Sequence, residues 1–234
     1  QRINSRGEQC SEYYNIDLYN LPILPVKDKI GDDVIIDIPL EDKTLYLNGD
    51  SITFGAGSEG GYGKILSSEY GCIITNSAVS GGTLASGTTY IDGTKRHCIA
   101  ESVVNSVNEQ YDYMILSGGF NDYGNNVPIG TLSDSEFCFT NEVTTDNVIG
   151  ALETMFRHIL QNYPTTKLFY LITHKANRCA KQKNLLSLTM QDYVNAIKSV
   201  CERYSIPVIN VWEEGRMLTV YDNICLALDI LDIS

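Results

Sequence analysis

The segment LYLNGDSITFG, residues 45–55, decides how the chain can be interpreted. An apolar run leads into Gly49-Asp50-Ser51, and a helix-like stretch follows after further glycines. This order predicts a tight turn from the carboxyl end of a strand into a helix, where backbone amides favour developing negative charge. Ser51 is therefore a candidate nucleophile. The alternative is that Asp50 or Ser51 only caps the helix, which is a common role for such residues.

The composition is ordinary for a globular protein with one substantial core: 234 residues, 43% hydrophobic and 20% charged. The net charge of −12 argues against nucleic acid or an anionic membrane as partner, since both reward basic surfaces. No apolar run has the length of a transmembrane helix. Because the chain begins with Gln1 and shows no signal-like apolar stretch, we expect a fragment or processed product with further domains upstream or downstream. We expect a secreted or surface-associated location.

The cysteines give no sign of a disulfide framework or a zinc site, because they are scattered, odd in number and lack C-x-x-C spacing. We expect packed, reduced thiols, no metal site and no cofactor. The seven are Cys10, Cys72, Cys98, Cys138, Cys179, Cys201 and Cys225.

Residues 1–42 differ from the rest of the chain. Residues 13–19 and 34–38 each have the composition of a short strand, but prolines interrupt the region. We expect an N-terminal arm or connector here, and the main domain over residues 43–234.

From residue 43 onward, short apolar runs alternate with longer segments of helical periodicity. Helices are predicted on apolar faces over residues 148–159 and 186–200, the first capped by Asp146 and closed before Pro164. Strands that alternate with helices pair in parallel, which predicts a three-layer α/β/α domain with a five-stranded parallel sheet. The predicted strands are Leu45–Leu47, Cys72–Thr75, Tyr113–Leu116, Leu168–Ile172 and Pro207–Val211.

Small, polar or ionisable residues follow four of these predicted strands. They are Gly49-Asp50-Ser51, then residues 76–83, then residues 117–122, then Thr173-His174-Lys175. Each is by itself an ordinary turn rich in Gly, Asn and Asp. Because ligands of open α/β sheets bind at the carboxyl ends of the strands, we expect these loops to form one site.

Serine ester hydrolysis needs an activated hydroxyl and donors aimed at the oxyanion. Ser51 supplies the hydroxyl and one amide. Gly81 lets a second amide approach closely, and Asn121 offers a side-chain amide. Asp50 and Asp122 are expected to hold these loops by accepting backbone hydrogen bonds.

These three blocks resemble those of the SGNH (GDSL-type) hydrolase superfamily, over about residues 44–212. The resemblance implies a flavodoxin-like sheet, Ser51 as nucleophile, and Gly81 and Asn121 as partners in the oxyanion hole. The family's last block, Asp-x-x-His, supplies the general base and its orienting carboxylate, and this sequence has no such motif. Three explanations stay open: the chain lacks its C-terminal end, another histidine substitutes, or the domain is a non-catalytic binder.

Of the histidines, only His174 is predicted at a strand's carboxyl end, as base or substrate contact, with a solvated loop residue as the alternative. His158 is expected on a helix surface beside Arg157, and His97 in a loop or at a helix start with no evident partner. Residues 56–60 approximate a G-x-S-x-G elbow, but the preceding strand ends too early, so Ser58 is discounted.

The leading hypothesis is thus a serine esterase acting on an acyl or O-acetyl ester, with carbohydrate esters among the substrates, and a small-molecule or glycan ester as its partner. A non-catalytic SGNH-fold module for glycan binding or assembly is the alternative. A flavodoxin-like flavin or phosphate binder is a third, but the sequence lacks G-x-x-x-x-G-K-[ST].

Overall fold

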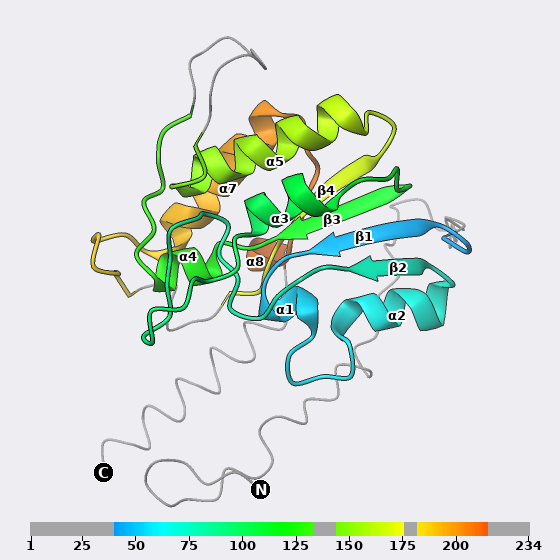
Figure 1. The fold of residues 1–234 in the computed structure, drawn as a ribbon, viewed down its shortest axis with the longest axis horizontal. Coiled ribbons are helices and arrows are strands. Elements are labelled where there is room, and N and C mark those ends of the chain that lie inside the picture. Colours follow the sequence, from blue (N-terminus) through cyan, green and yellow to red (C-terminus); the bar gives the residue numbers. More distant parts are fainter. Residues whose placement is uncertain (1–39, 133–143, 176–181, 215–234) are drawn as a thin grey trace, which may run out of the picture. The chain divides into compact units, whose positions relative to one another are not determined.

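The computed structural model describes residues 40–132, 144–175 and 182–214. They form a five-stranded parallel sheet with strand order β2-β1-β3-β4-β5, and helices cover the sheet (Figure 1). The predicted α/β class and five-stranded parallel sheet are confirmed. The strands are β1 Thr44–Asn48, β2 Ile73–Asn76, β3 Tyr113–Ser117, β4 Lys167–Ile172 and β5 Val208–Asn210.

Helices follow each of these strands along the chain. Figure 1 shows α3, α5 and α7 on one side of the sheet, with α1 and α2 on the other. The helices are α1 Ser51–Phe54, α2 Gly61–Tyr70, α3 Ile99–Ser106, α4 Phe120–Gly124, α5 Val148–Asn162, α7 Met190–Arg203 and α8 Val211–Glu214.

The main core lies between the sheet and helices α3, α5 and α7. Phe156 of α5 meets Tyr170 of β4 edge to face, with ring centroids 6.2 Å apart, and both side chains are fully buried. On the opposite face, a Cβ added to Gly63 of α2 would lie 2.9 Å from Cδ1 of Leu47. Glycine at position 63 therefore lets α2 pack closely on β1.

The predicted N-cap residue of α5 and the predicted start of α7 are wrong. Asn147, not Asp146, caps α5, because its Oδ1 accepts a hydrogen bond from the amide of Gly150 at 2.8 Å. Leu186 lies before α7, which begins at Met190. The helix starts there because Thr189 and Asp192 form a capping box.

Small differences also occur at strand ends. Cys72 precedes β2, and Pro207 and Val211 flank β5, with Val211 starting α8. Of the N-terminal arm expected over residues 1–42, residues 1–39 lie outside the described part of the chain.

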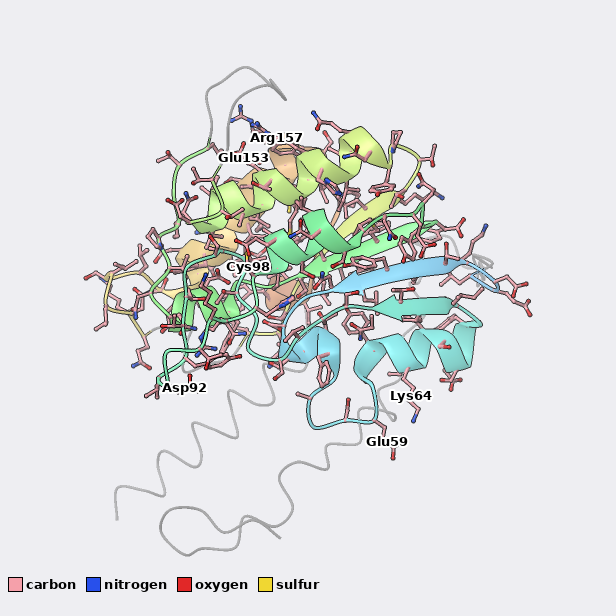
Figure 2. All side chains as sticks on the ribbon, viewed as in Figure 1. Glu59, Lys64, Asp92, Cys98, Glu153 and Arg157 are labelled. Atoms are coloured by element: carbon pink, nitrogen blue, oxygen red, sulfur yellow. The ribbon has the colours of Figure 1, made fainter. Side chains whose placement is uncertain are left out.

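The predicted surface position of His158 is wrong, and its neighbour Arg157 is buried. Arg157 is 7% exposed, and its Nε donates to the hydroxyl of Tyr204 at 2.7 Å. Its Nη2 lies 3.7 Å from Oε1 of buried Glu153, one turn earlier on α5 (Figure 2). His158 is half-buried against the ring of Tyr163, and this burial lowers its pKa.

Three cysteines lie in the described part of the chain, and all are buried free thiols, as predicted: Cys72, Cys98 and Cys201. Burial raises the pKa of Cys201 to about 12. The other four cysteines lie outside the described residues. Within the described ranges, no cluster of His, Cys, Asp or Glu side chains could hold a metal ion, and no helix has the length and apolarity to span a membrane.

Candidate active site

The loops after β1, β2, β3 and β4 emerge at one edge of the sheet, because all these strands run in parallel. β1 lies between β2 and β3 in the strand order. The Gly49-Asp50-Ser51 turn is therefore flanked by the loop that carries Gly81 and the loop that carries Asn121.

Ser51 is the first residue of α1, and Asp50 is its N-cap. Oδ1 of Asp50 accepts the amide of Ile52 at 3.0 Å. Capping is therefore the role of Asp50, and no hydrogen bond engages the Ser51 hydroxyl within the described part of the chain. The turn needs glycine at position 49, since a Cβ there would lie 2.6 Å from Oγ1 of Thr53.

The Gly81 loop is tied to both neighbouring loops by hydrogen bonds. The amide of Val79 donates to the carbonyl of Gly49 at 3.0 Å. Nδ2 of Asn121 donates to the carbonyl of Gly82 at 2.8 Å, which leaves the second hydrogen of this amide for another acceptor. Gly81 has φ +81°, in the left-handed region that favours glycine. Its N–H has no acceptor among the residues that the structure describes.

Asp122 joins α4 to the segment that follows the Gly81 loop. Its two carboxylate oxygens accept the amides of Leu84 at 2.9 Å and Ala85 at 3.1 Å, as expected of a loop-holding residue. The side chain is fully buried. Burial raises its pKa to about 6, although the two hydrogen bonds act in the opposite direction.

His174 follows β4 and is exposed. Burial raises the pKa of the Asp50 carboxyl, while the hydrogen bond from the Ile52 amide and then the electrostatic effect of His174 oppose that rise. His174 thus lies within electrostatic reach of the residue before Ser51.

His97 was not expected near this site. Its ring is half-buried, and Cδ2 would lie 3.5 Å from a Cβ added to Gly82. Nε2 is buried with no hydrogen-bond partner in the described residues, and burial lowers the pKa of this histidine. Its position depends on the loop's path, which the sequence pattern around Lys95-Arg96 does not indicate.

Ser58, discounted from the sequence, has a structural role. Its hydroxyl donates to the carbonyl of Gly55 at 2.9 Å and accepts the amide of Gly61 at 2.9 Å. These bonds close the connection between α1 and α2.

Sequence reasoning also missed the hairpin at residues 88–96, which places Tyr90 and Arg96 against Gly81. The amide of Tyr90 donates to the carbonyl of Thr94 at 2.8 Å. The available signal was Asp92-Gly93 between these residues, a pair typical of hairpin turns.

Comparison with known proteins adds family evidence to this geometry. One solved structure is 26% identical over 73% of this chain and 78% of that chain, with a TM-score of 0.59. A protein from Lactobacillus plantarum is 22% identical, over 75% and 80% of the two chains, with a TM-score of 0.60. A protein from Bacteroides ovatus, provisionally described as a GDSL-like lipase, is 15% identical over 72% and 84%, with a TM-score of 0.54.

A search of curated protein sequences gives no significant match. The model of one family, by contrast, matches residues 47–222, which include all three strand-end loops that carry Ser51, Gly81 and Asn121. The chain belongs to the GDSL-like lipase/acylhydrolase family.

Proposed function

We propose that this protein is a serine esterase that hydrolyses an acyl or O-acetyl ester, with Ser51 as nucleophile. The observation that carries the proposal is the hydrogen-bonded path from Gly49 through Val79 and Gly82 to Asn121. This path holds three loops with chemically suitable groups at one edge of the sheet. Family membership supports acyl hydrolysis as the reaction class.

In the proposed reaction, Oγ of Ser51 attacks the ester carbonyl as its proton passes to a base. The amides of Ser51 and Gly81 and the side chain of Asn121 donate to the oxyanion. Collapse of the tetrahedral intermediate expels the alcohol, which takes a proton, and leaves an acyl-serine. Water then attacks this ester, and its hydrolysis releases the acid and restores Ser51.

The proposed reaction needs a proton acceptor for the Ser51 hydroxyl. His174 is the histidine we propose to test first, because it follows β4 at the sheet edge that carries Ser51 and acts electrostatically on Asp50, the neighbour of Ser51. If His174 is the base, His174→Gln should lower kcat by several orders of magnitude. A rate equal to that of the unmodified protein would exclude His174 from this role.

The substrate proposal covers small-molecule and glycan esters. A panel of p-nitrophenyl esters with increasing acyl length, together with O-acetylated oligosaccharides, would define the acyl group and the alcohol. Activity on acetyl esters that falls with acyl length would support an O-acetyl substrate.

The test of the proposal is hydrolysis of p-nitrophenyl acetate by the unmodified protein and by Ser51→Ala. We expect Ser51→Ala to lower the rate by at least about 10³-fold, since the nucleophile is lost and only oxyanion stabilisation and binding remain. Ser58→Ala is the matched control, because it removes another serine hydroxyl seven residues away in the sequence and should keep the rate.

A fluorophosphonate probe gives a second measurement, because it forms a covalent bond with an activated serine. Mass spectrometry should locate the label on Ser51. An unchanged hydrolysis rate in Ser51→Ala would contradict the proposal.

A further inference from the structure

We propose that Tyr90 and Arg96 are positioning residues that hold the amide of Gly81 in the orientation an oxyanion requires. The inference rests on the proposed esterase function. It concerns the hairpin of residues 88–96, which belongs to none of the three family blocks.

Two rigid peptide units meet at Gly81. The first contains the carbonyl of Ser80 and the N–H of Gly81, and the second contains the carbonyl of Gly81 and the N–H of Gly82. Because a trans peptide is planar, fixing its carbonyl also fixes the direction of its N–H. The orientation of the Gly81 amide is therefore set by whatever holds the Ser80 carbonyl.

The hairpin holds both carbonyl groups. The hydroxyl of Tyr90 donates to the carbonyl of Ser80 at 3.4 Å, a long hydrogen bond. Nη1 of Arg96 donates to the carbonyl of Gly81 at 3.1 Å. The second unit is further fixed because the amide of Gly82 donates to Val79 at 3.0 Å.

Tyr90 and Arg96 also hold each other. Cζ of Arg96 lies 4.0 Å from the centroid of the Tyr90 ring, a cation–π contact. Nε of Arg96 donates to the carbonyl of Thr89 at 3.4 Å, and its backbone amide donates to Thr88 at 2.9 Å. Both side chains are thus attached to the same short hairpin.

The hairpin turns at Asp92, whose Oδ1 accepts the amide of Thr94 at 2.9 Å. Figure 2 shows Asp92 at the tip of the hairpin and Cys98 where the chain reaches the start of α3. Cys98 anchors the return, since its side chain caps α3 and donates to the carbonyl of Leu84 at 3.3 Å. The hairpin is therefore connected to the buried core.

Space at Gly81 is consistent with this arrangement. A Cβ added there would lie 2.6 Å from the Tyr90 hydroxyl and 3.3 Å from Nη1 of Arg96. The side chains of Tyr90 and Arg96 therefore occupy the space in which a Cβ of residue 81 would lie. The N–H of Gly81, in contrast, has no acceptor within the described residues, so it is available to an oxyanion.

The contacts have an electronic consequence as well. A donor on a carbonyl oxygen polarises the peptide and strengthens the N–H of the same unit as a donor. Tyr90 acts in this way on the N–H of Gly81. We therefore expect the effect on the transition state, in which the oxyanion forms, to exceed the effect on substrate binding.

The experiment compares Tyr90→Phe, Arg96→Gln and Arg96→Lys with the control Lys95→Gln, an exposed residue on the same hairpin. Tyr90→Phe keeps the ring under Arg96 and removes only the hydroxyl. We expect kcat for p-nitrophenyl acetate to fall about five-fold in Tyr90→Phe with KM unchanged. In Arg96→Gln it should fall by up to about 100-fold, as small displacements of catalytic groups can cost that much.

The Arg96→Lys variant should also have a lowered kcat. Its ammonium group cannot both stack on the ring of Tyr90 and donate to the carbonyl of Gly81 with the geometry of a planar guanidinium. Lys95→Gln should behave as the unmodified protein.

The second readout does not depend on activity. In protein labelled with ¹⁵N-glycine, the amide signal of Gly81 should shift in Tyr90→Phe and Arg96→Gln and stay in place in Lys95→Gln. An unmoved Gly81 signal in both variants would overturn the inference.

The two proposals fail in distinguishable ways. If Ser51→Ala loses hydrolysis but Tyr90→Phe and Arg96→Gln keep the full kcat, the positioning role is wrong and the esterase stands. If the Gly81 signal moves but Ser51→Ala keeps the rate, the contacts are real and the esterase proposal is wrong.

Discussion

Asp122 is a fully buried carboxyl whose pKa is raised by that burial to about 6, from an ordinary value of 3.8. A folded-state pKa above the unfolded value means that the folded protein binds this proton more tightly. The contribution of the protonated Asp122 carboxyl to the free energy of unfolding is fully present below the unfolded pKa. It is lost as the pH rises through about 6.

Replacing Asp122 with Asn removes this titration. We expect the difference in free energy of unfolding between the unmodified protein and Asp122→Asn to shrink by about 2 kcal/mol from pH 4.5 to pH 7.5. Urea unfolding at both pH values measures it. Asp92→Asn is the control: hydrogen bonds from Thr94 lower the pKa of this exposed carboxyl from its ordinary 3.8, so the carboxyl is ionised in both the folded and the unfolded protein over this pH range and its difference should stay nearly constant. A pH-independent difference for Asp122→Asn would show that this carboxyl does not titrate as inferred.

At the scale of one helix, the start of α5 distinguishes two neighbouring polar residues. Oδ1 of Asn147 accepts a hydrogen bond from the backbone amide of Gly150. Oδ1 of Asp146, in contrast, accepts a hydrogen bond from Nδ2 of Asn147 at 2.8 Å. Asn147→Ala should therefore lower the free energy of unfolding by about 1 kcal/mol, the usual cost of a lost N-cap. Asp146→Ala should cost less, since no backbone amide loses its partner. Equal losses in thermal or urea unfolding would contradict the assignment.

The contact between α5 and the end of α7 contains a buried ion pair. Arg157 contacts both Glu153 and the hydroxyl of Tyr204, which donates to Glu153 at 3.1 Å. Arg157→Met removes the cation and keeps Glu153 buried, so we expect a loss of about 3–5 kcal/mol. The double variant Glu153→Leu/Arg157→Met should recover most of it, because neither charge is then buried. Urea unfolding measures both.

Lys64→Met is the control for this prediction. It breaks the exposed pair between Lys64 and Glu59, whose atoms lie 2.7 Å apart on the surface beside α2 (Figure 2). The free energy of unfolding should stay within experimental error, because solvent screens exposed pairs. If Arg157→Met is as mild as Lys64→Met, the buried pair contributes nothing specific.

For the molecule as a whole, local patterns predict much of the sheet. Each apolar run became a strand to within a residue or two, and parallel pairing brought Gly49-Asp50-Ser51, Gly81 and Asn121 to one edge. The resemblance implied a flavodoxin-like sheet, but periodicity does not specify which strands are neighbours in the observed order β2-β1-β3-β4-β5. Strands and turns depend on the hydrophobic pattern and turn residues of short segments, so the sequence alone predicts them.

Features that depend on distant contacts were not predictable in this way. Arg157 is buried because Tyr204, 47 residues later, accepts its hydrogen bond. Tyr90 and Arg96 matter because the hairpin folds back onto Ser80 and Gly81, and the composition of residues 88–96 indicates only an exposed turn. The same limit applies to His97, whose position beside Gly82 follows from the path of that loop.

The charge of the whole chain has a consequence for stability. With 29 acidic and 17 basic residues, the net charge is −12, and the compact state brings these carboxylates together. Folding therefore works against self-repulsion, which salt screens as the Debye length falls from about 30 Å at 0.01 M to about 10 Å at 0.1 M.

We expect the Tm at pH 7 to rise by about 3 °C between 10 mM and 100 mM NaCl, equivalent to about 1 kcal/mol for a chain of this size. Differential scanning calorimetry measures the shift. The same salt series near the isoelectric point, about 4.6, is the control, because the net charge there is close to zero and screening has little repulsion to relieve. An equal rise at both pH values would assign the effect to general salt exclusion from the surface. A rise at pH 7 alone would show that net charge limits the stability of this fold.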